Sequence, residues 1–591
     1  MIQDVLEATT TRRDAKAYLN RFARTVEAEA ANGPILASQP RVNLGSLFAA
    51  NETSSLQGWG ELFEPQHGQA FHEQGSMHIA IIKLRAPSSV SNDQISAVGR
   101  TIAQLATLGM QSVVVLEPSE LQRSEDPEHR VLFDSQVCRV VDIFNDSRDN
   151  ESEEKLRAQR VDHIFEMSND VRKAGKLTMQ KSLTNVRIAN TDLFWSLLRR
   201  GIVPIVAPLA ASFDRGVRSV EVDADSLIVA LAKNLHGARP KFSKGKTGMK
   251  RCDTNQELQL ISMSFDRIII LDPAGGIPSA DRSHAPHVYI NMQQEYKDIK
   301  HQLQQYPLGI LGEGAKNVHV RNLELLRNSL EVLPNSSSGL IVAPEDVAST
   351  RAMPAEEFSP QVQTRSRRNP LIHNLLTDKP SISSSLPYGR SSGLGFGGPT
   401  STFVKRGMPL TTVPDVFAAP WSPPSSSHSK PCLSDPRIDM GKLVGLIEAS
   451  FGKKLDVNRY LARIGDCFAG LVIAGDYEGC ALFTWESSPA APMIKVPYLD
   501  KFAVLPQSQG TGASVADILF TCMIMDCFPR GVCWRSRVNN PVNKWYFERA
   551  KGAWKLPGNK WTSFWTTDTP SKKELKAYED ICSNIPPTWP S

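Results

Sequence analysis

The sequence predicts two α/β domains joined by a low-complexity linker. Short apolar strands alternate with helix-patterned segments between residues 78 and 343, which is typical of a sheet with helices packed on it. Half of the residues in 381–430 are Ser, Pro or Gly, a composition that buries too little apolar surface to fold alone. A compact α+β pattern then returns over 434–568. At roughly 150 residues per domain, a chain of 591 residues has room for this organisation.

The first domain, which we place at residues 76–345, follows an N-terminal extension (1–75) with a short helix at 14–24. The expected strands are apolar runs, and the expected helices follow them with helical spacing of apolar residues. Because the strands are apolar on both faces, they predict a parallel sheet covered by helices. We expect strands at 78–84, 111–116, 202–207 and 266–271, and helices at 90–108, 151–179, 193–200 and 225–234.

The second domain, which we place at residues 402–568, lies between the linker (346–401) and a C-terminal tail (569–591). Its first helix begins after the capping residue Asp439 and carries apolar residues along one face. A hairpin turn separates the next two strands. We expect an ordered patch at 402–413, strands at 471–474, 480–485 and 498–504, a helix at 512–525, and a final central strand at 531–535.

Composition argues against several function classes. The net charge is +5, from 67 basic and 62 acidic residues, and the sequence has no basic stripe of the kind that binds nucleic acid. The nine cysteines lack the spacing of metal ligands, so we expect no metal site. No apolar run is long enough for a transmembrane helix. Asp4, Glu7 and Asp14 make the N-terminus a poor transit peptide, so the residues alone leave the location open.

The most informative motif is Gln507-Ser-Gln-Gly510-Thr-Gly512, which joins the strand at 498–504 directly to the following helix. Small residues let the backbone of such a loop approach a ligand closely. The unpaired N–H groups and the dipole at the start of a helix favour a pyrophosphate. The alternative is a plain turn between a strand and a helix, but both flanking elements favour the ligand-binding interpretation.

This strand, loop and helix resemble the acetyl-CoA loop of the Gcn5-related N-acetyltransferase family. The resemblance implies an N-acetyltransferase fold for the C-terminal domain, with acetyl-CoA as a co-substrate and no tightly bound cofactor. Backbone groups of the strand would line the pantetheine, and the loop would hold the pyrophosphate. The cofactor-binding residues implied in this way are Phe502, Ala503, Val504, Gln507, Gln509, Gly510, Thr511, Gly512, Ala513 and Ser514.

A second block, WRSRVNNPVNKWYF at 534–547, together with LDKFAV at 499–504, resembles the N-acetylglutamate synthases of fungi and vertebrates. That resemblance covers most of 402–568 and implies transfer of an acetyl group to the α-amine of L-glutamate, the first step of arginine biosynthesis. Lys453, Lys501 and Arg535 would hold the glutamate carboxylates. Tyr546 and Asn540 would lie at the reacting centre. A mitochondrial matrix location, a homo-oligomer and a complex with acetylglutamate kinase are also implied.

The chemistry of glutamate fits these residue types. Two carboxylates favour at least two cations, and an arginine can bind one carboxylate through two hydrogen bonds. A basic residue is usually a solvated surface charge, but Lys501 and Arg535 lie in apolar strand runs, where an unpaired charge is costly. Tyr546, between two aromatic residues, is either catalytic or part of the core. No Glu or His stands out as a general base, so we favour a water relay near Asn540.

The N-terminal domain resembles the amino-acid kinase fold of acetylglutamate kinase, through HIAIIKL at 78–84, GIVPIVAP at 201–208 and Asp223-Ala-Asp225. Two phosphate-binding glycine turns of that fold are replaced here by Leu84-Arg85 and Glu117-Pro118, whose side chains would fill the space. The departures predict a domain without phosphoryl transfer. In this family such a domain binds arginine as a feedback inhibitor, and we place that pocket at 319–343.

Two alternatives from other function classes stay open. One is an active acetylglutamate kinase, against which the replaced glycine turns count. The other is a non-catalytic, arginine-sensing subunit that regulates a partner kinase, against which the intact Gln-x-x-Gly-x-Gly motif and Tyr546 count.

Overall fold

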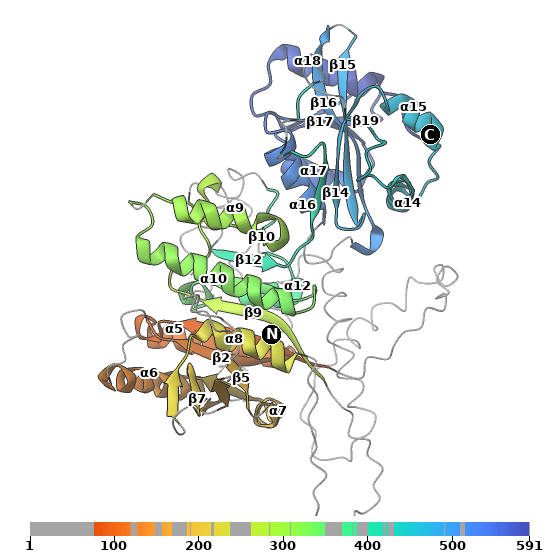
Figure 1. Ribbon diagram of the computed structural model, residues 1–591. Coiled ribbons are helices and arrows are strands. Elements are labelled where there is room, and N and C mark those ends of the chain that lie inside the picture. Colours follow the sequence, from red (N-terminus) through yellow and green to blue (C-terminus); the bar gives the residue numbers. More distant parts are fainter. Residues whose placement is uncertain are drawn as a thin grey trace, which may run out of the picture.

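A computed structural model describes residues 76–589 with several gaps, of which the longest are 168–185, 237–261, 349–368 and 387–399. The extension 1–75, with its expected helix, lies outside the described residues. Figure 1 shows the N-terminal domain in orange to green and the C-terminal domain in blue, each built on a sheet of its own. Within the described part of the chain, no helix is both long and apolar enough to cross a membrane.

The N-terminal sheet is parallel, as predicted, except where β11 and β12 run antiparallel. Its strands lie in the order β10-β12-β11-β9-β1-β2-β6-β3. The expected strands are all present, and the one at 266–271 begins four residues earlier. The bounds are β1 Ser76–Arg85, β2 Met110–Glu117, β3 Arg157–Val161, β6 Ile202–Val206, β9 Ser262–Leu271, β10 Tyr289–Asn291, β11 Ser338–Val342 and β12 Ser401–Lys405.

Helices cover both faces of this sheet because its strands are apolar on both sides. Along β1, Ile79 and Ile81 enter one core while Ala80 and Ile82 enter the other. The first core is completed by α7 Thr191–Arg199, α8 Ala224–Leu235, α9 Met292–Gln305 and α10 Glu313–Val332. The second is completed by α5 Asn92–Thr107, α6 Pro127–Asp146, α11 Pro344–Ala348 and α12 Pro370–Thr377. A separate small sheet holds β4 Phe165–Met167, β5 Val186–Ile188, β7 Leu209–Ser212 and β8 Arg218–Glu221.

The helix expected over 151–179 is wrong. Its described residues instead form β3 and β4, and the preceding helix α6 was not anticipated. The sequence of β3, RAQRV, has only two apolar residues, Ala158 and Val161, and its pairing with β6 outweighs the helix preference of the surrounding charged residues. The segment expected as a linker (346–401) likewise contains an ordered helix, α12, which buries Leu371, Leu375 and Leu376 against the second face.

The C-terminal sheet is mixed, in the order β13-β14-β15-β16-β17-β19-β18. Two helices cover each face, and α18 packs against β16 and β17. The strand expected at 531–535 is β17, and two further strands, β18 and β19, follow it in the chain. The expected tail (569–591) contains α18. The strands are β13 Leu410–Val413, β14 Phe468–Ala474, β15 Gly479–Ser488, β16 Ala491–Val504, β17 Cys533–Arg537, β18 Gly552–Lys555 and β19 Trp561–Trp565; the helices are α14 Met440–Phe451, α15 Val457–Ile464, α16 Val515–Cys522, α17 Asn543–Arg549 and α18 Lys572–Asn584.

The two domains meet where β12 passes into β13. The boundary expected at residue 402 falls inside β12, which pairs with β10 and β11 of the N-terminal sheet, whereas β13 pairs with β14 of the C-terminal sheet. Gly407 lies between these strands with φ +74°, and a Cβ atom there would lie 2.0 Å from Oδ1 of Asn291. Asn291 Nδ2 donates to the carbonyl of Met408 at 2.8 Å. Only glycine fits this crossing.

A second contact between the domains involves Ser383 and Ser385, which lie in a short described piece of the linker. Arg549 Nη2, on α17, donates to the Ser383 hydroxyl at 2.8 Å and to Asp517 Oδ1, on α16, at 3.1 Å. Both serine hydroxyls also donate to that same oxygen of Asp517. On the other side, Arg282 of the N-terminal domain donates to the backbone carbonyl of the serine between them at 2.7 Å. The segment therefore ties both domains together.

Candidate active site

The centre of the C-terminal sheet opens between β16 and β17. Strand β16 pairs with β15 as far as the Gly479–Val504 pair, but on its other edge the described residues pair with β17 only at Tyr498 and Cys533. Beyond Tyr498 this edge of β16 is released from β17, and at the end of the stretch the N–H of Val504 donates to Ser450 Oγ at 3.1 Å. The predicted pantetheine-binding residues Phe502, Ala503 and Val504 all lie on this released stretch.

The expected cofactor loop follows immediately. Gln507 is exposed within a single helical turn at 506–508, and helix α16 begins at Val515, so the predicted order of strand, loop and helix is confirmed. A Cβ atom on Gly479 would lie 2.6 Å from Cγ1 of Val515, which places the first turn of α16 beside the end of β16. The predicted residues between the flanks, Gln509, Gly510, Thr511, Gly512, Ala513 and Ser514, lie outside the described residues.

Lys501 is buried on β16, with a side chain that is 5% exposed. Its Nζ donates to Asp500 Oδ2 at 2.7 Å, to the Asp500 carbonyl at 3.2 Å and to Thr588 Oγ1 at 2.8 Å. Burial lowers the pKa of Lys501 against the opposing effect of Asp500, and the charge of Arg535 contributes to the lowering. The two predicted carboxylate-binding cations Lys501 and Arg535 therefore lie on the two diverging strands, within electrostatic reach of each other.

Arg535 and Lys453 are placed differently from Lys501. Arg535 Nη1 and Nη2 donate to the carbonyls of Cys582 and Ile585 at 2.6 Å and 2.5 Å, at the C-terminal end of α18, where a cation is favourable. Its guanidinium also lies 4.2 Å from the centre of the Trp561 ring. Arg535 therefore has a structural role that the sequence did not reveal. Lys453 is exposed, just after α14.

The predicted catalytic residues lie on α17 and in the turn before it. Tyr546 is 8% exposed, and its ring centre lies 5.4 Å from that of Trp534 and 5.5 Å from that of Phe564. Burial raises the pKa of the Tyr546 hydroxyl, so this group keeps its proton at neutral pH. Asn540 Nδ2 donates to Ser536 Oγ at 2.8 Å, and its Oδ1 accepts from the N–H of Val542 at 3.0 Å. The chemical roles of both residues stay predictions.

Sequence reasoning missed the carboxylate that holds Lys501. Asp500 is 3% exposed, and its Oδ2 accepts from the Tyr460 hydroxyl at 2.6 Å. Arg463 donates to Oδ1 of the same carboxylate. Burial alone would raise the pKa of Asp500, but Lys501 and Arg463 hold it below its usual value. The signal was an acidic residue inside an apolar strand, directly before the lysine that had been singled out.

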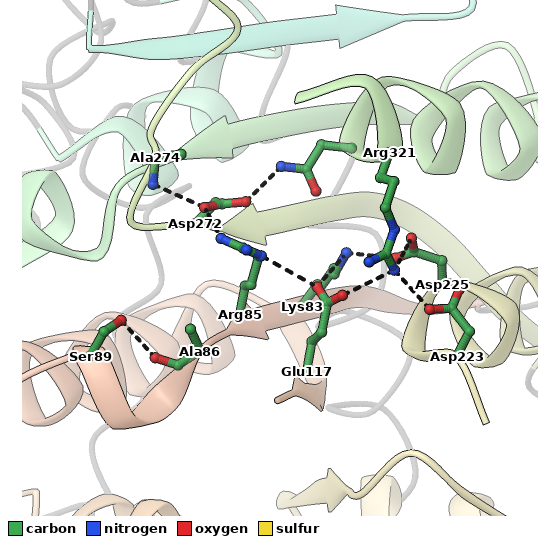
Figure 2. Close-up of polar contacts among 11 residues, drawn as sticks. Lys83, Arg85, Ala86, Ser89, Glu117, Asp223, Asp225, Asp272, Ala274 and Arg321 are labelled. Carbon is green, nitrogen blue, oxygen red and sulfur yellow. Dashed lines mark hydrogen bonds and ion pairs between the residues drawn. The ribbon is translucent and has the colours of Figure 1, made fainter. Parts of the chain in front are cut away.

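The N-terminal domain carries a network of ion pairs at the carboxyl ends of its parallel strands, where open α/β sheets bind ligands (Figure 2). Lys83 Nζ lies 2.5 Å from Asp225 Oδ1 and 2.8 Å from Glu117 Oε2. Arg321 Nη2 contacts Glu117 Oε1 at 3.0 Å, Asp223 Oδ1 at 2.7 Å and Asp225 Oδ2 at 3.2 Å. Glu117 is 1% exposed. The carboxylate that replaces a phosphate-binding turn therefore lies inside this network.

Arg85, the other replacement, is held in the same way. Its Nη1 lies 3.2 Å from Asp272 Oδ1 (Figure 2). The other carboxylate oxygen, Asp272 Oδ2, accepts from Asn322 Nδ2 at 2.7 Å. The backbone N–H of Ala274 also donates to Asp272 Oδ1 at 2.9 Å. Ion-paired side chains, Arg85 and Glu117, thus lie at the ends of β1 and β2, where the resemblance to the kinase fold led us to expect glycine turns. The segment proposed for arginine, 319–343, comprises most of α10, a turn and β11, and Ser337 in that turn donates to the carbonyl of Phe265 at 2.8 Å.

The fold and the opened strand pair define an N-acetyltransferase. In agreement, the family model described as "N-acetyltransferase, of N-acetylglutamate synthase" matches residues 426–585. The chain is 36% identical to the mitochondrial amino-acid acetyltransferase of Ajellomyces capsulatus, covering 99% of this chain and 94% of that one. It is 38% identical to the protein of the same name from Aspergillus oryzae, covering 99% and 89%. The chain belongs to the family of mitochondrial amino-acid acetyltransferases.

Among solved structures, the chain is similar to the N-acetylglutamate synthase of Neisseria gonorrhoeae complexed with coenzyme A and N-acetyl-glutamate. That likeness has 13% sequence identity and a TM-score of 0.42, and it covers 84% of this chain and 96% of that one. A second structure of the Neisseria gonorrhoeae enzyme, complexed with coenzyme A and L-arginine, has 11% identity and a TM-score of 0.37 and covers 85% and 93%.

Proposed function

We propose that this enzyme transfers the acetyl group of acetyl-CoA to the α-amine of L-glutamate. The observation that carries the proposal is the position of Lys501 and Arg535 on β16 and β17, the two strands that part beyond Tyr498. The released edge of β16 suits an extended ligand such as pantetheine. The two cations suit a substrate with two carboxylates. Acetyl-CoA and glutamate would thus meet between the same two strands.

In this mechanism the amine nitrogen of glutamate attacks the thioester carbonyl carbon, the N–C bond forms and the C–S bond breaks. A backbone N–H of 502–504 stabilises the oxyanion that develops on the carbonyl oxygen. Tyr546 donates its proton to the departing thiolate, which is consistent with a hydroxyl that stays protonated in its buried surroundings. The proton lost by the amine leaves through water near Asn540. The cations contribute by orienting the amine toward the thioester.

The direct test is turnover of acetyl-CoA with L-glutamate, followed by release of the free thiol. L-Glutamine is the matched control substrate, because it keeps the length and the amine but lacks the second carboxylate. We expect turnover with glutamate and a large loss of kcat/KM with glutamine. Equal rates with both substrates would remove the assignment of the cations to the two carboxylates.

We further propose that the N-terminal domain is a regulatory domain that binds arginine and does not transfer phosphate. The ion pairs of Glu117 and Arg85 support this, because both side chains occupy positions that phosphates would need. The two alternatives are an active kinase and a non-catalytic sensor, and membership of the acetyltransferase family counts against the second. An ATP-dependent phosphorylation assay with N-acetylglutamate tests the first alternative. Acetyl-CoA turnover, measured with and without arginine, tests the second alternative and the regulation together.

The cellular setting belongs to the same proposal. Relatives named as mitochondrial support placing this enzyme in the mitochondrial matrix. Homo-oligomerisation and a complex with acetylglutamate kinase follow from the family resemblance alone. Fractionation of cells, and size determination of the purified enzyme with and without the kinase, are the measurements that decide them.

A further inference from the structure

The end of the chain lies across the predicted glutamate site. We call residues 585–589, which follow α18, the C-terminal strap. Its Ile585 carbonyl accepts from Arg535, and its Thr588 hydroxyl accepts from Lys501 at 2.8 Å. Its last described residue, Trp589, donates from Nε1 to the carbonyl of Lys454 at 2.9 Å. The strap therefore contacts two of the three predicted substrate cations, Lys501 and Arg535, directly. It also contacts Lys454, the neighbour of the third predicted cation, Lys453.

Lys501 is saturated as long as the strap is in place. Its Nζ donates to the backbone carbonyl of Asp500, to Asp500 Oδ2 and to Thr588 Oγ1. Three acceptors match the three N–H donors of an ammonium group. Asp500 belongs to the same strand and is fixed by Tyr460 and Arg463. The Thr588 hydroxyl is the acceptor that comes from another segment. A substrate carboxylate can therefore reach Lys501 only by taking the position of that hydroxyl.

The attachment of the strap suits a segment that moves. Pro586 and Pro587 are exposed and carry no N–H group, so this stretch cannot join a strand ladder. The Trp589 ring, which is only partly buried, packs on Phe451 with ring centres 4.9 Å apart. Phe451 is itself 41% exposed. The strap is thus held by the packing of Trp589 at the rim of the core, by the contact of its ring with Lys501 Nζ at 5.6 Å and by two side-chain hydrogen bonds. A short segment held mainly by side chains at a partly solvated rim can open locally without unfolding the domain.

We propose that the C-terminal strap is a substrate-displaced cover, in which the Thr588 hydroxyl occupies on Lys501 the place that a glutamate carboxylate takes. The proposal rests on the proposed function, because it requires that Lys501 binds substrate. It goes further in stating that part of the binding free energy of glutamate is spent on opening the strap. The closed strap keeps the buried ammonium hydrogen-bonded when no substrate is present, which avoids the cost of an unpartnered donor.

The test is steady-state kinetics of the full chain with Thr588→Val, which keeps the shape of the side chain and removes the acceptor. In this variant the closed form of the strap leaves one Lys501 N–H without its acceptor, whereas the free energy of the open form is unchanged. We expect the KM for glutamate to fall about tenfold, as for loss of one hydrogen bond to a charged group, with kcat and the KM for acetyl-CoA unchanged. Thr588→Ser keeps the hydroxyl and should behave as the wild type. A glutamate KM that stays the same or rises in Thr588→Val would overturn the proposal.

Trp589→Ala provides a second variant, because it releases the strap from the α14–α15 loop by removing the hydrogen bond to the Lys454 carbonyl, and it also removes the ring that lies 5.6 Å from Lys501 Nζ. It should also lower the KM for glutamate. Trp554→Ala is the matched control, since that ring is 64% exposed on β18 and lies outside the strap. Strap movement is read independently from the fluorine resonance of Trp589 in protein labelled with 5-fluorotryptophan, assigned with Trp589→Phe. We expect saturating glutamate to shift it, and an unshifted resonance would contradict opening.

Failure of the function and failure of the strap give different results. If the wild type does not acetylate glutamate, the proposed function fails. If the wild type does acetylate glutamate but Thr588→Val and Trp589→Ala keep its KM, only the strap proposal fails.

Discussion

Lys501 and Asp500, neighbours on β16, form a buried ion pair with Nζ and Oδ2 2.7 Å apart. Successive residues of a strand normally point to opposite faces, so an ion pair between them requires an irregular backbone. The register between β15 and β16 shifts at this place: Leu482 is paired with Lys501 and the next residue, Phe483, with Leu499, so that Asp500 is left out of the ladder. This irregularity of the strand brings the carboxylate to the ammonium group.

The pair predicts a large effect on stability. Asp500→Asn keeps the shape of the side chain but leaves Lys501 and Arg463 without their shared counter-charge in a buried site. We expect the free energy of unfolding to fall by about 3–5 kcal/mol, as when one partner of a buried ion pair is removed. Denaturant titration of the purified protein measures it. Asp476→Asn, which breaks the exposed pair with Lys442 (Nζ–Oδ1 2.6 Å), is the control and should change little. Similar small effects in both variants would show that Asp500 is not structurally required.

Arg535→Met should reduce both activity and stability. It deletes two charge-assisted hydrogen bonds to the end of α18, each worth roughly 1.5–3 kcal/mol and not additive, so the melting midpoint should fall. We also expect kcat/KM for glutamate to fall about 100-fold or more, with acetyl-CoA affinity little changed. A lowered midpoint with normal glutamate kinetics would leave Arg535 only its structural role at α18.

The cofactor loop is tested by Gly512→Glu and Gly510→Glu. A carboxylate there would repel the pyrophosphate and fill the space that the small residues leave. We expect acetyl-CoA binding, measured by calorimetry, to be lost while the protein remains folded. Gly445→Glu on α14 is the matched control, because an added Cβ meets no atom within 4 Å there. Near-normal acetyl-CoA affinity in either loop variant would remove the cofactor assignment.

The ion pairs of the N-terminal domain predict a pH dependence. Burial opposes ionisation of Asp225, but Lys83 and Arg321 prevail and hold its pKa below its ordinary value of 3.8. The folded state therefore binds this proton more weakly than the unfolded state, so the pair stabilises the domain above pH 4 and loses its effect as the pH falls below that. Acid unfolding should consequently be shallower below pH 4 in Asp225→Asn than in the wild type, at lower overall stability. Parallel acid-unfolding curves would contradict this linkage.

A fragment beginning at Gly407 should fold and retain some acetyltransferase activity without inhibition by arginine. A start at residue 400 would carry β12, whose partners β10 and β11 would be missing and whose edges would be exposed. The fragment also loses the serine contacts of Asp517 and Arg549, so we expect reduced stability. Thiol release with and without arginine measures the outcome. Arginine inhibition of the folded fragment would show that the N-terminal domain is not the sensor.

Sequence patterns predicted the central strands because these are continuous apolar runs, such as HIAIIKL in β1 and IVPIV in β6. They also predicted the start of α14, because Asp439 caps it. They failed at β3, where burial comes from pairing with β6, and at α12, which lies next to a polar linker. Local composition does not reveal a partner that is distant in sequence.

The parts of the candidate site whose residues are contiguous in the sequence could be predicted, and the contacts between residues far apart in the sequence could not. The strand, loop and helix around Gln507 could be identified because the motif and both flanks are contiguous in the sequence. The attachment of Arg535 to the end of α18 could not be foreseen, because the carbonyls of Cys582 and Ile585 lie about fifty residues further along the chain. A longer separation, of 87 residues, hid the hydrogen bond between Thr588 and Lys501.

The passage from β12 to β13 has a mechanical consequence. Strand β12 is an interior strand of the N-terminal sheet, and β13 is an edge strand of the C-terminal sheet. Only residues 406–409 lie between these two strands. A force that draws the acetyltransferase domain away is therefore applied to β12, the second strand of the N-terminal sheet, which β10 and β11 flank. Pulling the acetyltransferase domain away would therefore load the hydrogen bonds that join β12 to both of its neighbours, so unfolding of the N-terminal sheet would begin at this strand.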